Sequence, residues 1–226
     1  MRRYLVWVFA AMVVSHSCAK EQVVHPPAAI SILKKAGLTE DPLFVDPVMR
    51  VSSRLIAAAR QSAYAPRGRA LCWTIAVYDR PAQGAYVLPD GVIVVYAGTF
   101  RLAETEAGLA ALLGHEIVHA LASNAAPSAP CLGTHDQSPP VFTFQDELDA
   151  DDAGLNLMAD AGYDPRELLR LWERMRLERQ ERDKLYEHVT YGRRMEHIGQ
   201  HLPEAIMRYE RTNRAPQKRL PSHHSR

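Results

Sequence analysis

The chain has few cysteines, almost no net charge and no long apolar run outside its first residues. Its three cysteines leave room for at most one disulfide within the chain. The net charge of +1 gives no broad electrostatic basis for binding nucleic acid or an acidic membrane surface. No internal stretch is apolar and long enough for a transmembrane helix. What remains is a chain of 226 residues, enough for one domain with a proper core.

The N-terminus departs from this ordinary composition. Arg2 and Arg3 precede an apolar run, residues 4–14, and small and polar residues follow it. This pattern is typical of a signal peptide, predicted here over residues 1–19 with release of a soluble protein. The alternative is acylation of Cys18, which would attach the protein to a membrane. Export leads to an oxidising compartment, where Cys72 and Cys131 are expected to pair; two separate buried thiols are the alternative.

The rest of the chain divides into a linker, a domain and a tail. Residues 20–45 are predicted to be a linker with one short helix, residues 46–210 the domain, and residues 211–226 a disordered basic tail. Within the domain the pattern predicts strands and helices in an α+β arrangement that is mostly helical, with a small antiparallel sheet or hairpin. The expected elements are a helix from 46, a strand over 71–78, a hairpin over 85–96, and helices over 107–122, 146–161 and from 164.

One helix carries the clearest chemistry. Residues 107–122 read AGLAALLGHEIVHALA, and their only polar side chains are His115, Glu116 and His119. A helix that is apolar all round should be buried, and buried polar groups need a partner. His115 and His119 share one helix face because they are four residues apart. This is the HExxH signature of zinc peptidases, in which Glu116 is the general base and Thr105 is a credible N-cap.

A catalytic zinc ion needs a third protein ligand and an open position for water. The helix over 146–161 offers four acids: Glu147, Asp149, Asp151 and Asp152. Glu147 and Asp151 lie one helical turn apart, so one could bind the metal while the other orients a ligand histidine. A three-histidine metzincin site is excluded, because Ala122 and Ala125 stand where that pattern needs glycine and histidine.

Four motifs in the same order now resemble a known family. GHEIVHAL is followed by ELDADDAGLNLMADAGYDP, preceded by GAYVLPDGVIVVYAG, and followed later by HVTYGRRMEHI. Together they resemble the HtpX / CAAX prenyl protease family of gluzincin metallopeptidases, and within it the exported bacterial BepA and LoiP branch. The chain departs from that pattern at Gly84, Asp90 and Val189, where the family commonly has asparagine, a Pro-Gly-Gly turn and proline. The resemblance implies a peptidase domain without the family's helical repeats or transmembrane helices.

The resemblance also implies roles for individual residues. His115, His119 and Glu147 would bind one zinc ion per chain, with Asp151 and Arg194 supporting them. The strand Ala85, Tyr86 and Val87 would pair with an extended substrate. His188 would stabilise the oxyanion, or instead occupy the open zinc position and keep the enzyme latent.

The function expected from these features is zinc-dependent hydrolysis of peptide bonds. Glu116 would take a proton from the attacking water and deliver it to the leaving amine. The resemblance implies unfolded or misassembled cell-envelope proteins as substrates and a periplasmic or exported location, with no nucleic-acid partner. Two alternatives remain: a latent or non-catalytic zinc-binding assembly factor of the envelope, and an esterase or amidase that uses the same chemistry.

Overall fold

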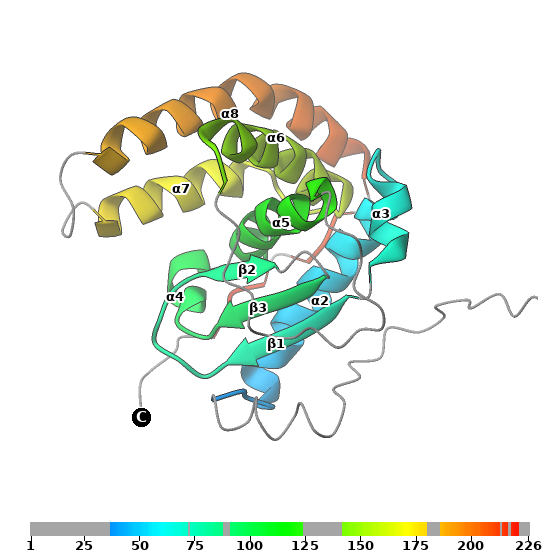
Figure 1. Cartoon of the computed structure of the whole chain (residues 1–226), viewed down its shortest axis with the longest axis vertical. Coiled ribbons are helices and arrows are strands. Elements are labelled where there is room, and N and C mark those ends of the chain that lie inside the picture. The colour runs from blue at the N-terminus through cyan, green and yellow to red at the C-terminus, as the bar shows by residue number, and fades with distance from the viewer. Residues whose placement is uncertain are drawn as a thin grey trace, which may run out of the picture.

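The computed structural model of the chain describes residues 37–71, 73–87, 91–123, 142–179, 186–212, 214–216 and 218–221. Figure 1 shows a small sheet in the lower part of the molecule, with most of the helices above it or behind it. The elements are α2 (Pro42–Ala59), α3 (Ala65–Ala70), β1 (Thr74–Tyr78), β2 (Ala85–Val87), β3 (Val92–Tyr96), α4 (Thr99–Ala103), α5 (Glu106–Ala122), α6 (Phe144–Asp160), α7 (Arg166–Arg179) and α8 (Tyr186–Arg211). The predicted α+β, mostly helical fold class is confirmed.

Helix α5 lies at the centre of the fold. It packs against α2, α4, α6, α7 and strand β2, and Figure 1 shows it between the sheet and the pair formed by α6 and α8. Fifteen of its seventeen residues are buried, as predicted for a helix that is apolar all round. Thr105 is its N-cap and accepts a hydrogen bond from the backbone N–H of Gly108. The HExxH motif is thus held in the core by contacts on every side.

The sheet is mixed, with the strand order β1-β3-β2. The predicted hairpin is present, because β2 and β3 pair antiparallel. The pairing of β1 with β3 is parallel, which the expectation of an antiparallel sheet did not include. The reason lies in β3, whose first four residues, Val92 to Val95, are all buried. A continuous apolar run suits a central strand covered on both faces, so β3 takes the middle place between the other two strands.

The first helix begins earlier than predicted. Asp41 caps α2, and its side chain accepts a hydrogen bond of 2.9 Å from the backbone N–H of Leu43. Asp46-Pro47 resembles the same cap-and-proline pair and was expected to start the helix, but Pro47 lies inside it. Both pairs fit a helix start, and the earlier one decides where α2 begins. The helix that was expected to begin at residue 46 therefore begins at residue 42.

Part of the predicted disordered tail is packed against the domain. The backbone N–H of Glu106 donates to the carbonyl of Lys218, and the N–H of Leu220 donates to that of Glu104. Arg219 forms a β-bridge with Thr105, and Ala215 is buried. Expecting disorder at residues 214–216 and 218–221 was wrong, because the backbone of this segment pairs with backbone groups at the N-terminal end of α5 that the helix itself leaves without a partner.

Two glycines let α5 and α6 cross at close range. A Cβ atom at Gly154 would lie 3.0 Å from the backbone nitrogen of His115, and one at Gly114 would lie 3.3 Å from the carbonyl oxygen of Gly154. No side chain fits between the two backbones here. The crossing brings the acidic side of α6 onto the histidines of α5, so the spacing of these helices decides the geometry of the site.

We expect Gly154→Ala to lower the free energy of unfolding by about 1–3 kcal/mol, because the added methyl group overpacks the crossing. It should also weaken zinc binding, because the added methyl group would push α6 away from α5 and Glu147 would move with it. Gly192→Ala is the matched control: nothing lies within 4 Å of a Cβ atom at that helical position, so alanine should be neutral or slightly stabilising. Urea unfolding and zinc titration of both variants test this, and equal effects would contradict it.

Candidate metal centre

Two histidine rings of α5 meet edge to edge inside the protein. The Nε2 atoms of His115 and His119 are 3.1 Å apart, and the rings are perpendicular. Both side chains are buried, whereas Glu116 between them is only partly buried. The spacing of HExxH therefore directs both imidazoles to one point and leaves the glutamate within reach of solvent.

Helix α6 adds a carboxylate at the same point. Glu147 places Oε2 3.4 Å from Nε2 of His115, and Oε1 3.3 Å from Nε2 of His119. The three side chains form a group that could hold one metal ion. A tetrahedral zinc site with bonds of about 2.0–2.1 Å separates its ligand atoms by roughly 3.3 Å. The donor set and its spacing therefore fit zinc, with the fourth position left open.

Asp151 holds His115 from the opposite side of the ring. Its carboxylate is fully buried and lies 3.0 Å from Nδ1 of His115. Trp172 on α7 donates its indole N–H to the same carboxylate at 3.0 Å. A hydrogen bond to Nδ1 fixes the tautomer that leaves Nε2 free to bind a metal, so Asp151 is placed to orient His115 from the side away from Glu147 and His119.

Arg194 on α8 connects the two acids of α6. Its Nε and Nη2 donate to Asp151 at 2.7 and 2.8 Å, and Nη1 lies 2.7 Å from Oε2 of Glu147. The guanidinium also lies over the ring of Trp172, 4.4 Å from its centroid. A buried arginine that spans two carboxylates can fix both positions. Trp172 gave no signal in the sequence beyond its place on the apolar face of a helix.

The electrostatics of the site favour the ionised forms of Glu147 and Asp151 and the protonated form of His115. Burial lowers the pKa of His115, but its hydrogen bonds to Asp151 and Glu147 outweigh this effect and raise the pKa to about 9. Burial also raises the pKa of Glu147, but hydrogen bonds from both histidines outweigh it and bring the pKa well below its usual range. Burial raises the pKa of Glu116 to about 7. Without metal, a proton on His115 compensates the carboxylates.

Zinc must displace that proton, which predicts a pH-dependent affinity. At less than one zinc per chain, the apparent affinity should fall about tenfold for each pH unit below 9, because His115 binds metal only when it is neutral. Above pH 9 the dependence should flatten. A zinc titration against a competing chromophoric chelator from pH 7 to 9.5 measures this, and calorimetry in two buffers counts the protons released. An affinity that stays constant between pH 7 and 8.5 would contradict the prediction.

The predicted substrate strand lies at an edge of the sheet. In β2, Tyr86 faces Val94 of β3, and Tyr96 of β3 donates to the carbonyl of Gly84. Hydrogen-bonded pairs alternate along antiparallel strands, so Ala85 and Val87 direct their backbone N–H and C=O groups away from β3. Among the residues that the structure describes, no other strand pairs with this edge. It is placed beside α5, against which β2 packs.

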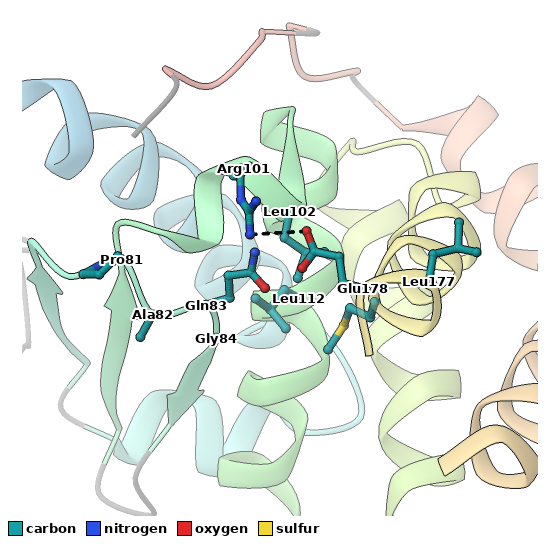
Figure 2. Close-up of a pocket in the computed structure, with 10 residues that line it drawn as sticks. Pro81, Ala82, Gln83, Gly84, Arg101, Leu102, Leu112, Leu177 and Glu178 are labelled. Atoms are coloured by element: carbon teal, nitrogen blue, oxygen red, sulfur yellow. Dashed lines mark ion pairs between the residues drawn. The ribbon is translucent and has the colours of Figure 1, made fainter. Parts of the chain in front are cut away.

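A pocket opens where this edge strand begins, and we call it the β2 pocket. Its volume is about 790 Å³, and Figure 2 shows Arg101 of α4 and Glu178 of α7 meeting across it. Its walls come from the loop before β2, from α4, from Leu112 on α5 and from the end of α7. The amide nitrogen of Gln83 is buried and has no hydrogen-bond partner among the described residues. Gln83 is a site residue that sequence reasoning missed, since one glutamine in a loop carries no signal.

Four predicted features lie outside what the structure describes. The backbone of His188 is part of α8, but the side chains of residues 186–190 are not described. Cys72, Cys131 and the N-terminal residues 1–36 are not described either. The oxyanion role of His188, the disulfide, the signal peptide and the acylation of Cys18 therefore stay predictions. In the part of the chain that is described, no helix has the length and apolar character needed to cross a membrane.

Comparison with known proteins shows which family the sequence around this site is similar to. Residues 48–134 match the model of peptidase family M48. It is similar to the mitochondrial metalloendopeptidase OMA1 of Schizosaccharomyces pombe, with 30% identity over 190 residues, 72% of this chain and 54% of that protein. OMA1 of Bos taurus is 30% identical over 183 residues, 64% of this chain and 35% of that protein. Both relatives are named as metalloendopeptidases, the enzyme class that was predicted from the sequence.

The same comparisons bear on two finer predictions. The chain is similar to the M48 model and to OMA1 proteins, and nothing in these matches supports the HtpX and BepA branch. The predicted periplasmic or exported bacterial location is wrong, because the relatives from two yeasts, a plant and mammals are named as mitochondrial enzymes. The charge and hydropathy of residues 1–19, on which that prediction depends, do not identify the receiving compartment. The chain spans about half or less of the length of these relatives.

Proposed function

We propose that this protein is a zinc-dependent endopeptidase that cuts extended polypeptide segments. The observation that carries the proposal is the meeting of His115, His119 and Glu147: the two Nε2 atoms are 3.1 Å apart, and each lies 3.3 to 3.4 Å from one of the two carboxylate oxygens of Glu147. Glu116 stands beside this set on the same helix and is partly exposed. A purely structural zinc site has four protein ligands and no use for a base.

The residues of the chain divide the chemistry among them. When bound, zinc supplies Lewis-acid polarisation of the scissile carbonyl and acidifies the attacking water. Glu116 holds that water by its carboxylate, takes one of its protons and delivers it to the leaving amine. The positive charge of the ion favours the carboxylate form of Glu116, whose pKa is otherwise about 7. Asp151 keeps Nδ1 of His115 hydrogen-bonded throughout, so that Nε2 stays available to the metal.

The edge of β2 supports an extended substrate. The backbone groups of Ala85 and Val87 that point away from β3 can pair with a peptide laid alongside, which is how exposed sheet edges bind peptides. Gln83 lies just before this strand, and its buried amide nitrogen lacks a partner. A substrate carbonyl or side chain that enters the β2 pocket would satisfy that donor. Main-chain pairing requires a free strand, which favours unfolded polypeptide over a folded surface.

Casein hydrolysis tests the function. The zinc-loaded protein should cut casein, lose activity with a chelator and regain it with zinc. A tightly folded protein of similar length should resist, because it offers no strand to the edge of β2. Zinc binding without hydrolysis of casein, or of a mixture of unfolded proteins, would overturn the proposal in favour of a non-catalytic zinc-binding factor. Hydrolysis of ester or amide probes alone would favour an esterase or amidase.

A further inference from the structure

A second cluster of metal-binding side chains joins α6 and α8. Asp152 of α6 faces His197 and His201, which are one turn apart on α8. Nε2 of His197 lies 2.8 Å from Oδ2 of Asp152, and Nδ1 of His201 lies 3.2 Å from Oδ1. The ring centroids of the histidines are 4.5 Å apart, and one donor atom from each of the three residues falls within 4.8 Å of the others.

The hydrogen bonds of this cluster are incomplete. Nδ1 of His201 lies 3.0 Å from the carbonyl oxygen of His197 as well as 3.2 Å from Asp152. One ring nitrogen has at most one hydrogen to offer, so it cannot satisfy both acceptors. Oδ1 of Asp152 is buried and has no hydrogen-bond partner among the described residues. An unpartnered buried carboxylate oxygen is costly, and a cation beside it would remove the cost.

The donor chemistry selects the kind of ion. Two imidazole nitrogens and one carboxylate suit zinc and neighbouring transition metals, whereas magnesium and calcium prefer oxygen ligands alone. The side chains of Asp152, His197 and His201 are 29%, 25% and 44% exposed, so water can complete the coordination. We propose that Asp152, His197 and His201 form a second zinc site, separate from the HExxH centre.

The place of this site in the fold suggests what it does. Asp151 points inward to His115, and its neighbour Asp152 points to the second cluster. His197 follows Arg194 by three residues on α8, so the cluster lies about one helical turn from the arginine that holds Asp151. A metal ion here crosslinks the two helices whose contact positions the catalytic ligands. Zinc in excess of one equivalent should therefore stabilise the fold, because it binds only the folded arrangement.

Counting bound zinc tests the proposal without using activity. All proteins carry His223→Ala and His224→Ala, so that the paired histidines of the tail do not contribute. Equilibrium dialysis against zinc buffered in the micromolar range should give two ions per chain for this parent. His115→Ala with His119→Ala should leave one, and His197→Ala or Asp152→Asn should each leave one. Asp149→Asn, an exposed acid on the same helix, should leave two.

Thermal unfolding gives the second readout. In the variant that lacks both HExxH histidines, excess zinc should raise the melting temperature by about 3 °C, and adding His197→Ala should abolish the rise. A parent that binds only one zinc would have no second site, and this would overturn the proposal. A second zinc that persists in both His197→Ala and Asp152→Asn would be bound adventitiously elsewhere, which would overturn it as well. Loss of casein hydrolysis would not bear on these counts, so the two proposals fail separately.

Discussion

Glu116→Gln should reduce casein hydrolysis about 10²–10⁴-fold while zinc remains bound. Glutamine keeps the size of the side chain and its hydrogen bonding to water but cannot accept a proton. The histidines and Glu147 are unchanged, so the ions bound per chain and the pH dependence of zinc affinity should stay close to those of the parent. The loss should appear in kcat more than in KM, since the proton moves during the chemical step.

The control is Glu196→Gln, which removes an exposed carboxylate from α8. It should leave kcat, KM and zinc content unchanged. Metal analysis of each preparation separates loss of the base from loss of the metal. If Glu116→Gln kept a tenth or more of the parent activity with full zinc content, Glu116 would not be the general base. The water would then have to give its proton to another group.

Arg194→Ala should be the most destabilising single change at the site. It leaves the buried carboxylate of Asp151 and the nearby Glu147 without their shared cation, and it removes the packing over Trp172. Breaking a buried ion pair from one side costs about 3–5 kcal/mol. The affinity for zinc should also fall about 10–100-fold, because the supports of His115 and Glu147 are lost together. Urea unfolding with a chelator present measures the first effect, and chelator competition measures the second.

Arg193→Ala is the matched control, one residue away on the same helix. Arg193 is exposed, and its guanidinium lies over the ring of Phe144, 4.8 Å from the centroid, so its loss should cost less than about 1 kcal/mol. Arg194→Lys keeps the charge but cannot span two carboxylates and should fall between the two. Equal losses for Arg193→Ala and Arg194→Ala would show that the bridge to Asp151 contributes no special stability.

Much of the site could be predicted from local pattern. HExxH on an apolar helix places His115 and His119 on one face because the helical period is fixed by backbone geometry. The same reasoning gave the N-cap at Thr105 and the end of α6 before Gly162, whose φ of 82° suits glycine at a helix C-terminus. The order of strands could not be predicted this way, because hydrophobic periodicity indicates that a strand is buried but not which strands it pairs with.

The sequence by itself determined the metal-binding motif, the helix that carries it and the hairpin beside it. These depend on residues a few positions apart, and their geometry follows from backbone periodicity. Tertiary structure alone decided that Arg194 spans Asp151 and Glu147, that Trp172 supports Asp151, and that the tail packs at the start of α5. It also brought Asp152 to His197 and His201. Such contacts join residues tens of positions apart, so they depend on which elements pack together, which local periodicity does not specify. The closeness of α5 and α6, which Gly114 and Gly154 permit, is likewise a property of the folded chain.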